Sequence, residues 1–284
     1  MSTRVRGAVV ITGSSTGIGR ATALALDRQG FEVFAGVRRP EDGEALRASA
    51  SGSLEPLIVD VTDGASIAAA AARVREATGA RLAGLVNNAG VVVPGPVEGI
   101  ELDELRRQLE VNVVGQVAVT QAFLSMIRAA RGRVVFMSSI GGRMSVPHLS
   151  PYHASKHALE AIGDSLRQEM RRFGVGVAII EPGAVATPFW DKGLGEAPKA
   201  RAAMGADLLA IYGDELDRIE AASERTAARG VPPERVADAV VHALTDAKPR
   251  TRYLVGTDAK LQAAMRTVLP ARVFDRLIAR ELGT

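Results

Sequence analysis

A phenol and an ammonium group stand four residues apart in the chain, at Tyr152 and Lys156. If this segment is helical, the two side chains share one face and lie about one turn apart. A positive charge at that distance, together with that of a bound oxidised nicotinamide, would lower the pKa of the phenol, which then exchanges a proton more readily with an alcohol or carbonyl oxygen. The hydroxyl of Ser139, at the end of a predicted strand, suits binding of the same oxygen. These residue types indicate proton transfer of the kind that accompanies hydride transfer.

A glycine-rich turn near the N-terminus suits the cofactor that such chemistry needs. Residues 12–19 read T-G-S-S-T-G-I-G, between an apolar run and a helical pattern. Backbone N–H groups and the positive end of the helix then point to where a pyrophosphate would sit. Turns also use glycine for structural reasons, but the order strand, turn, helix favours the phosphate site. The predicted contacts are Gly13, Ser14, Ser15, Gly17, Ile18 and Gly19.

The elements that must position these groups follow from the hydrophobic pattern. Apolar runs of strand length alternate with helical patterns, which predicts a parallel sheet with helices on both faces. Helices are predicted over residues 18–29, 66–77, 152–173 and 233–245. Strands are predicted over residues 8–12, 32–37, 55–59, 84–87, 133–137, 176–180 and 252–255. We therefore expect an α/β fold, a doubly wound Rossmann-type sheet of seven parallel strands in a single domain over residues 1–284.

Two segments depart from the alternation. Residues 188–230 mix apolar side chains with many charges, and we predict a mobile lid over the substrate there. Residues 257–284 form a predicted helical extension, of which 261–282 are amphipathic and basic. Packing on the body or on a partner subunit is favoured for this extension, and contact with a membrane surface is left open.

Composition limits the remaining classes. The chain has 284 residues and no cysteine, so disulfide and thiolate chemistry are excluded. Its net charge is +3 and its arginines are scattered, which gives no support for nucleic-acid binding. We see neither a signal-peptide pattern nor an apolar run of the about 20 residues that a membrane span needs. A cytoplasmic location is expected.

The phosphate turn has the spacing G-x-x-x-G-x-G instead of the commoner G-x-G-x-x-G. In this respect the chain resembles the short-chain dehydrogenase/reductase family. Further matches follow in the family's order, firmly over about residues 5–190 and loosely beyond. They are Asp60-Val61, Asn87 to Gly90, Asn112, Ser139, Tyr152 with Lys156, and Pro182-Gly183 with Thr187.

The resemblance implies roles for these residues. Ser139, and not Ser138, is at the family spacing before Tyr152, and Asn112 would help to hold Lys156 through a water. Lys156 would also bind the nicotinamide ribose beside Tyr152. The other implied cofactor contacts are Asp60 and Val61 at the adenine, Asn88, Ala89 and Gly90 at its ribose, and Pro182, Gly183, Val185 and Thr187 at the nicotinamide carboxamide. Standing alone, Asp60 would instead be interpreted as a helix cap.

The second strand bears on the choice of cofactor. Its last residue is Val37, where NAD-preferring members of the family have an acid, and Arg38 and Arg39 follow. Arginines suit a 2′-phosphate, and the Ser14 hydroxyl could add a hydrogen bond to it. NADP(H) is therefore expected. NAD(H) stays open, because the two arginines could also be a solvated turn.

The substrate is less defined. Residues 31–38 and the C-terminal extension resemble the steroid and retinol dehydrogenase side of the family, which implies a hydrophobic secondary or primary alcohol, or its carbonyl, such as a steroid, retinoid or lipid-like molecule. Phe189, Trp190 and His148 are candidate substrate contacts. No metal is expected, since His153 and His157 lack a matching carboxylate.

Two other classes of function are left open. One is a regulatory protein that binds NAD(P) without turnover, and the other is a sugar-nucleotide epimerase or dehydratase. The intact set of Ser139, Asn112, Tyr152 and Lys156 argues against the first, and the spacing of the phosphate turn against the second. The family's habit of pairing through the helices around Asn112 and Tyr152 implies a homodimer or homotetramer.

Overall fold

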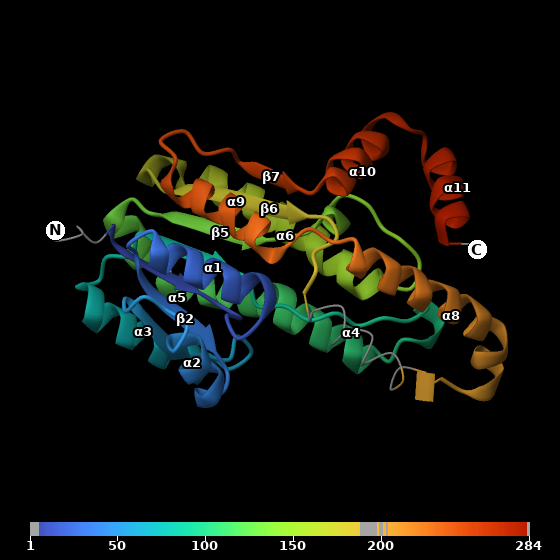
Figure 1. Ribbon diagram of the computed structural model, residues 1–284, viewed down its shortest axis with the longest axis horizontal. Helices are drawn as coiled ribbons and strands as arrows, with labels where there is room; N and C mark the ends of the chain where they lie inside the picture. The colour runs from blue at the N-terminus through green and yellow to red at the C-terminus, as the bar shows by residue number, and fades with distance from the viewer. Residues whose placement is uncertain (1–5, 188–197, 199–200, 203, 283–284) are drawn as a thin grey trace.

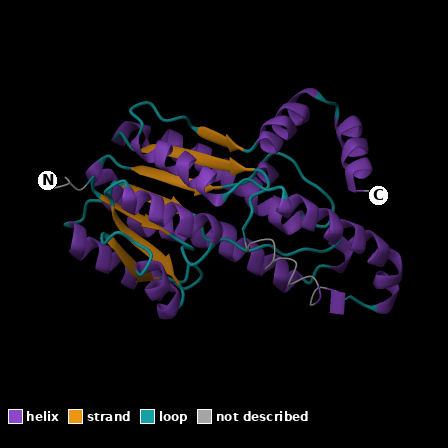
Figure 2. Ribbon diagram, viewed as in Figure 1, coloured by secondary structure: helices purple, strands orange, loops and turns teal. Residues whose placement is uncertain are grey.

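One sheet organises the computed structural model, which describes residues 6–187, 198, 201–202 and 204–282. Its strands are all parallel and lie in the order β3-β2-β1-β4-β5-β6-β7. They are β1 (Ala8–Ile11), β2 (Glu32–Val37), β3 (Leu54–Ile58), β4 (Gly84–Asn87), β5 (Arg133–Met137), β6 (Gly176–Pro182) and β7 (Arg252–Val255). Helices lie on both sides of this layer (Figure 2). The predicted doubly wound α/β fold with seven parallel strands is confirmed.

Each face of the sheet has its own hydrophobic core, because successive side chains of a strand point to opposite faces. On one face Val9 and Ile11 pack with apolar residues of α1 (Gly17–Arg28), α2 (Pro40–Arg47) and α9 (Pro233–Thr245). On the other face Ala8 and Val10 pack with α3 (Gly64–Thr78), α5 (Gly115–Ala130) and α6 (Ser150–Met170). Helices α1 and α9 lie side by side across the first face (Figure 1).

Local signals set several helix ends. The carboxylate of Asp63 accepts a hydrogen bond from the Ala65 N–H at 2.9 Å and caps the start of α3. Gly79 ends that helix in the left-handed conformation, with φ of 59°. Helix α6 begins two residues before its predicted start, and its last predicted residues form the 3-10 turn η4 (Arg171–Phe173) before Gly174. Aspartate at a helix start and glycine after a helix end are common signals at these positions.

The predicted lid segment contains a regular helix, α8 (Ala206–Ala228), which the sequence pattern did not indicate. Two contacts fasten it to the body: the Tyr212 hydroxyl donates to Glu98 at 2.8 Å, and His148 Nε2 lies 3.2 Å from the carboxylate of Glu215. The role of residues 188–230 as a substrate lid stays a prediction.

The C-terminal extension is helical, as expected. Helices α10 (Thr257–Val268) and α11 (Ala271–Leu282) enclose a third, small core, in which Phe274 and Ile278 pack with Ile140 and Met144 of the segment after β5. They stand beyond the end of β7, on the side where the C-terminus lies (Figure 1). The extension thus packs on the part of the chain that leads into α6.

One stretch of the described residues is long and apolar enough, by length and composition, to cross a membrane. It spans Leu102–Ala130 with a mean hydropathy of 1.3 in its most apolar window, and comprises α4 (Leu102–Leu109), the π-helical turn η2 (Glu110–Val114) and α5. Its residues Val119, Phe123 and Met126 belong to the core below the sheet. Core helices of folded domains pass the same test, so this stretch is weak evidence for a membrane span.

Candidate active site

The glycine turn after β1 has the backbone that a phosphate site requires. Gly13 and Gly17 have φ angles of 69° and 56°, a region that other residues rarely adopt. A Cβ atom at Gly13 would lie 2.8 Å from Cα of Ala89, and one at Gly17 would lie 3.2 Å from Cβ of Thr187. Helix α1 begins at Gly17, so its first N–H groups face the turn. The turn fits a pyrophosphate, with Ser15 and Ile18 partly exposed beside the glycines.

A network between the ends of β1 and β4 fixes the shape of this turn. The Thr12 hydroxyl oxygen accepts hydrogen bonds from the N–H groups of Asn88 and Ala89 at 3.0 and 3.1 Å. The Asn88 amide donates to the carbonyls of Thr12 and Gly13 at 2.9 and 3.1 Å. These strands are where the strand order reverses, which is where doubly wound sheets bind their ligands. The Asn88 side chain is thus committed to the turn, and packing of Asn88, Ala89 and Gly90 along the adenine ribose stays a prediction.

Ser14 does not take the predicted role. Its side chain is buried, and its hydroxyl donates to the carbonyl of Ile11 at 3.1 Å. Its N–H donates to the Gly36 carbonyl at 2.8 Å, which ties the turn to β2. The prediction that the Ser14 hydroxyl reaches a 2′-phosphate is therefore wrong, because this hydroxyl is buried and donates its hydrogen bond to a backbone carbonyl inside the fold.

The adenine end of the predicted site lies after β3. Asp60 accepts hydrogen bonds from the N–H and hydroxyl of Thr62 at 2.9 and 2.7 Å. The backbone hydrogen bond from Thr62 is the main reason that the pKa of Asp60 is lowered, and the nearby charge of Arg38 acts in the same direction. Val61 is buried beside Gly115. Asp60 thus caps its own turn, and its contact with adenine stays a prediction.

The two arginines after β2 differ in their partners. The Arg39 guanidinium donates to both carboxylate oxygens of Asp42, at 3.0 and 2.9 Å, which raises the pKa of Arg39. Arg38 is exposed and forms no hydrogen bond or ion pair with any other residue that the structure describes. Of the two cations, Arg38 is thus the one available to a 2′-phosphate.

The three predicted catalytic residues converge at the carboxyl end of β5. Ser139 caps the 3-10 turn η3 (Ile140–Gly142) by accepting from the Gly141 N–H at 3.1 Å, and its hydroxyl hydrogen-bonds Tyr152. The Lys156 ammonium lies over the Tyr152 ring, 5.6 Å from its centre, and donates to the carbonyl of Met137 at 2.8 Å. Helix spacing on α6 and the end of one strand thus bring the phenol, hydroxyl and ammonium together.

Burial controls the ionisation of this set. It raises the pKa of Tyr152 to about 12, although the Ser139 hydrogen bond acts in the opposite direction. It lowers the pKa of Lys156 to about 8, against the opposing negative charge of Glu160. In the protein alone, loss of water outweighs the favourable contacts, and the predicted lowering of the tyrosine pKa by Lys156 together with a bound oxidised nicotinamide stays a prediction. The phenol is protonated at neutral pH, the form that donates a proton during carbonyl reduction.

Asn112 lies in the π-helical turn η2 and is fully buried. Its amide oxygen accepts from the Val91 N–H at 2.8 Å, and its amide nitrogen donates to the Val91 carbonyl at 3.0 Å and to Ser155 at 3.1 Å. Among the described residues no hydrogen bond joins it to Lys156. Asn112 thus anchors α6 one residue before the lysine and holds the segment after β4, while a water-mediated link to Lys156 stays a prediction.

Replacing Asn112 tests this anchoring. Asn112→Ala leaves the Val91 N–H without its partner and removes the hydrogen bond to Ser155, while Gln108 still donates to the Val91 carbonyl at 2.7 Å. We expect the free energy of unfolding to fall by about 1–3 kcal/mol in urea denaturation. The exposed Gln121→Ala on α5 is the control and should change it by less than about 0.5 kcal/mol. Equal stability of the two variants would show that the Asn112 contacts contribute nothing.

The predicted nicotinamide segment follows β6 and is held from two sides. The Gly183 N–H donates to the Val255 carbonyl at 2.9 Å, and the Ala184 N–H donates to the Asp258 carboxylate at 2.7 Å. Val185 is buried and pairs with Val231 in an isolated parallel bridge. Asp258, in the first turn of α10, was missed by sequence reasoning. A first-turn acid is a common helix signal, and nothing local indicates that this one reaches across to Ala184.

Of the three predicted substrate contacts, the structure describes only His148. His148 is buried with its ring edge toward Tyr212 of α8, at 6.0 Å between ring centres. Its side-chain contacts are with α8, and contact with a substrate stays a prediction. Phe189 and Trp190 lie outside the described residues.

Both ring nitrogens of His153, next to the site, hydrogen-bond to backbone groups. His153 Nδ1 lies 3.0 Å from the Gly141 carbonyl, and its Nε2 accepts from the Val146 N–H at 3.1 Å. The proton is therefore on Nδ1, and burial lowers the pKa of His153. Within the described ranges no three His, Asp or Glu side chains are grouped to hold a metal ion.

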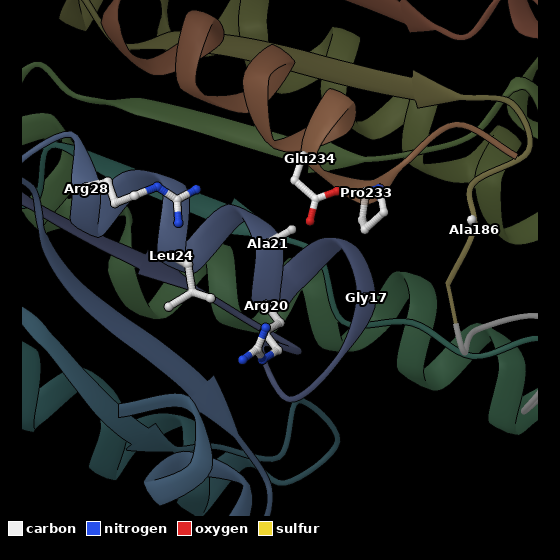
Figure 3. Close-up of a pocket in the computed structure, with 8 residues that line it drawn as sticks. All are labelled: Gly17, Arg20, Ala21, Leu24, Arg28, Ala186, Pro233 and Glu234. Atoms are coloured by element: carbon white, nitrogen blue, oxygen red, sulfur yellow. The ribbon is translucent and has the colours of Figure 1, made fainter. Parts of the chain in front are cut away.

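A surface pocket lies next to the phosphate turn. Figure 3 shows Gly17, Arg20 and Leu24 along one side of α1, with Pro233 and Glu234 at the start of α9 opposite them. None of the catalytic candidates lines it. We therefore assign this pocket neither the substrate nor the reacting end of the cofactor.

Comparison with known proteins identifies the family. The family model described as short chain dehydrogenase matches residues 7–198, which contain the glycine turn and the Ser139, Tyr152 and Lys156 set. The chain belongs to the short-chain dehydrogenase family. It is an oxidoreductase that acts on CH–OH groups, and the family binds NAD(P).

Relatives of this short-chain dehydrogenase match it over nearly its whole length. Retinol dehydrogenase 5 of Mus musculus is 40% identical over 277 residues, which are 95% of this chain and 87% of that protein. An NADPH-dependent 3-dehydrocapnine reductase of Ornithobacterium rhinotracheale is 34% identical over 279 residues, 96% of either chain. A short-chain dehydrogenase of Streptomyces avermitilis has a similar structure, with a TM-score of 0.77 and 30% identity, covering 100% of this chain and 97% of that one. The family resemblance predicted from the motifs is confirmed.

Proposed function

We propose that this short-chain dehydrogenase uses NADP(H) to interconvert a hydrophobic alcohol and its carbonyl compound. The observation that carries the proposal is the convergence of Ser139, Tyr152 and Lys156 at the carboxyl end of β5. The glycine turn follows the carboxyl end of β1, which lies at the same edge of the sheet. The nicotinamide, when bound, supplies or accepts the hydride. The protein must supply the proton and hold the oxygen.

The side chains divide this work between them. In carbonyl reduction the Tyr152 hydroxyl gives its proton to the substrate oxygen as hydride reaches the carbon, so the product is the neutral alcohol. The Ser139 hydroxyl donates a hydrogen bond to the same oxygen while negative charge develops on it. The Lys156 ammonium beside the ring stabilises the phenolate that remains. Alcohol oxidation follows the same path in reverse.

The preference for NADP(H) rests on Arg38. This exposed guanidinium at the end of β2 lies near Asp60, and Val37 leaves no acid there to repel a 2′-phosphate. A relative named as NADPH-dependent supports the same choice.

Replacing Arg38 with an acid tests the preference. In Arg38→Asp, we expect NADPH affinity to fall about 10- to 100-fold through loss of the charged contact, and NADH to become the better ligand. The rise in melting temperature with each cofactor measures this. Arg39→Ala, whose side chain is held by Asp42, should change the order little. A wild-type protein that NADH stabilises more than NADPH would contradict the assignment.

For the substrate we propose a steroid, retinoid or other lipid-like molecule. Relatives named as retinol dehydrogenases, at 38–40% identity, support a hydrophobic alcohol or aldehyde. The experiment is a spectrophotometric screen of retinoids, steroids and long-chain carbonyls against short polar ketones and sugar nucleotides. The proposal expects kcat/KM to be highest for the hydrophobic set. Turnover confined to the polar set would refute it.

We also propose an oligomeric state and a location for the enzyme. A homodimer or homotetramer would pair the helices that carry Asn112 and Tyr152, in a cytoplasmic enzyme. Analytical ultracentrifugation tests the assembly, and a purely monomeric protein at working concentration would contradict it.

A further inference from the structure

Helix α6 carries a row of ionisable residues that continues past the catalytic pair. Tyr152, Lys156, Glu160 and Asp164 follow one another at intervals of four, so they share one face of the helix. Lys156 and Glu160 are both largely buried, at 4% and 9% exposure. A buried carboxylate thus stands one turn beyond the buried ammonium.

Arg252, the first residue of β7, holds this carboxylate. Its guanidinium donates to one oxygen of Glu160 at 2.9 and 3.2 Å and to both oxygens of Asp164 at 3.0 and 2.8 Å. Such multidentate contacts fix both position and direction. The last strand of the sheet thus fixes the orientation of Glu160 on the catalytic helix.

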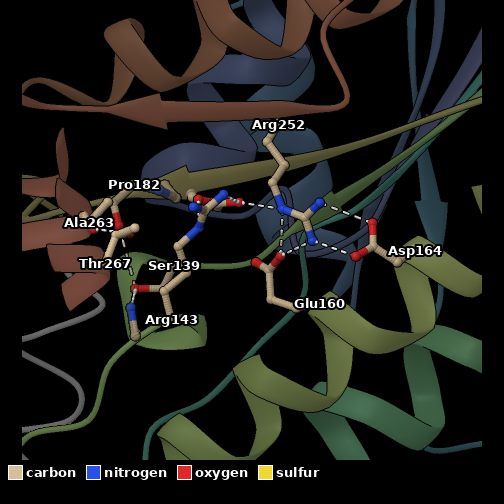
Figure 4. A network of polar contacts seen from close by, with 10 residues as sticks. Ser139, Arg143, Glu160, Asp164, Pro182, Arg252, Ala263 and Thr267 are labelled. Carbon is tan, nitrogen blue, oxygen red and sulfur yellow. Dashed lines mark hydrogen bonds and ion pairs between the residues drawn. The ribbon is translucent and has the colours of Figure 1, made fainter. Parts of the chain in front are cut away.

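Three other charged residues, Glu181, Arg143 and Arg167, belong to the same network of ion pairs. The buried Glu181 of β6 lies between Arg252, at 3.1 Å, and Arg143, at 2.9 Å, and Arg167 pairs with Asp164 at 3.0 Å. Figure 4 shows Arg252 between Glu160 and Asp164, with Arg143 on the side toward Ser139. Among the residues that the structure describes, Glu181 and Asp164 each have two arginine partners, whereas Glu160 has one.

The Glu160 oxygen that Arg252 does not contact lies in closely packed surroundings beside Gly142 and Ser138. This oxygen is buried and has no hydrogen-bond partner in the described part of the chain, and the same holds for the Ser138 hydroxyl. A Cβ atom at Gly142 would lie 2.8 Å from the Ser138 hydroxyl oxygen and 3.1 Å from the free Glu160 oxygen. Ser138 in turn follows Met137, whose carbonyl accepts from Lys156. The Glu160 oxygen that Arg252 does not contact thus lies beside Gly142 and Ser138, one turn of α6 from Lys156.

We propose that Glu160, held by Arg252, is a positioning residue that keeps the Lys156 ammonium charged beside Tyr152. The inference rests on the proposed function, in which that charge stabilises the tyrosine phenolate. Glu160 touches neither cofactor nor substrate in this account and acts through Lys156.

The balance of charges explains why the lysine needs such support. Burial lowers the pKa of Lys156 to about 8, and the negative charge of Glu160 opposes that shift. Without Glu160 the ammonium would lose its proton closer to neutral pH. The ionisable groups around the pair are Tyr152, His153, His157, Asp164 and Arg167 on α6, Arg143 after η3, Glu181 on β6 and Arg252 on β7.

The lysine can be observed directly because the chain has only five, at positions 156, 192, 199, 248 and 260. In protein labelled with ¹³C-lysine, the side-chain signal of Lys156, assigned with Lys156→Arg, is followed by NMR against pH without cofactor. In Glu160→Gln we expect the Lys156 titration midpoint to move down by about half to one pH unit, since a nearby negative charge is removed. Asp164→Asn, which alters the same arginine cluster one turn farther away, should move it less.

A second variant and the wild-type midpoint keep the inference testable. Glu160→Met, an apolar replacement of similar size, should give the same downward shift if Glu160→Gln fails to fold. A wild-type midpoint near that of a free lysine, or no shift in either variant, would overturn the proposal whatever the enzyme's activity.

The kinetic counterpart separates this inference from the proposed function. Activity that needs the ammonium declines as pH rises through the Lys156 pKa, so the alkaline limb of kcat/KM should move down by the same interval in Glu160→Gln. Glu160→Asp, which keeps the charge, should restore most of the wild-type profile. An unmoved limb beside a shifted NMR midpoint refutes the positioning role, whereas absence of turnover in the wild type refutes the proposed function and leaves the NMR test standing.

Discussion

Tyr152→Phe is expected to lower kcat/KM by about 10²- to 10⁴-fold and to leave cofactor binding intact. The substitution keeps the buried ring, which packs edge-on to His153 at 5.8 Å and lies under Lys156, and removes only the hydroxyl that meets Ser139. The loss should therefore fall on the proton transfer. Initial rates, together with the NADPH-induced rise in melting temperature, measure the two properties separately.

Tyr253→Phe is a matched control for this result. Tyr253 has the same exposure as Tyr152, 6%, and its hydroxyl also has partners, His242 at 2.9 Å and the Arg250 N–H at 3.0 Å. It should cost about 1 kcal/mol of stability and keep turnover within a few-fold of wild type. Near-normal activity of Tyr152→Phe would remove the tyrosine from the chemistry, and loss of NADPH binding as well would make it structural.

Gly19→Ala is expected to disrupt the phosphate turn. A Cβ atom there would overlap the carbonyl oxygen of Gly13 and lie 2.5 Å from the Asn88 amide nitrogen, which is itself bonded to the turn. Neither neighbour can move without breaking the link between β1 and β4. We expect the free energy of unfolding to fall by roughly 2–3 kcal/mol and NADPH affinity to fall at least about tenfold. Chemical denaturation and fluorescence titration measure the two effects.

The control for this prediction is Gly64→Ala at the first position of α3. Nothing lies within 4 Å of a Cβ atom built there, and its φ is negative. It should leave cofactor binding unchanged and stability equal or up to about 1 kcal/mol higher. If both alanine variants behaved alike, close packing at Gly19 would not shape the cofactor site.

The sheet could be predicted because its strands are apolar on both faces. The predicted bounds of β2, β4, β5 and β7 agree with the structure, and β6 runs two residues farther, to Pro182. Helix α8 escaped prediction because Leu216 is its one buried residue among those described, so it lacks a broad buried apolar stripe. Its place depends instead on single polar contacts from distant loops, such as Tyr212 with Glu98.

Residue types and spacing could identify the site, but their environment could not be read from the sequence. Tyr152 and Lys156 were found from helix geometry, yet the opposing effect of burial, which raises the pKa of Tyr152 in the protein alone, was missed because burial has no local signature. Ser14 was misassigned for a similar reason, since its partner is the carbonyl of Ile11 inside the fold. Asp258 and Arg252 were missed because each binds a residue more than 70 positions away, Ala184 and Glu160.

The most direct test of the account follows the hydride itself. The enzyme is incubated with NADPH deuterated at the transferring position and a hydrophobic aldehyde or ketone, and the product is analysed by mass spectrometry. The account predicts an alcohol that carries one deuterium on its carbinol carbon, formed by the wild type and Tyr253→Phe and all but absent with Tyr152→Phe. A protein that binds NADPH but transfers no deuterium to any carbonyl of the panel would contradict it.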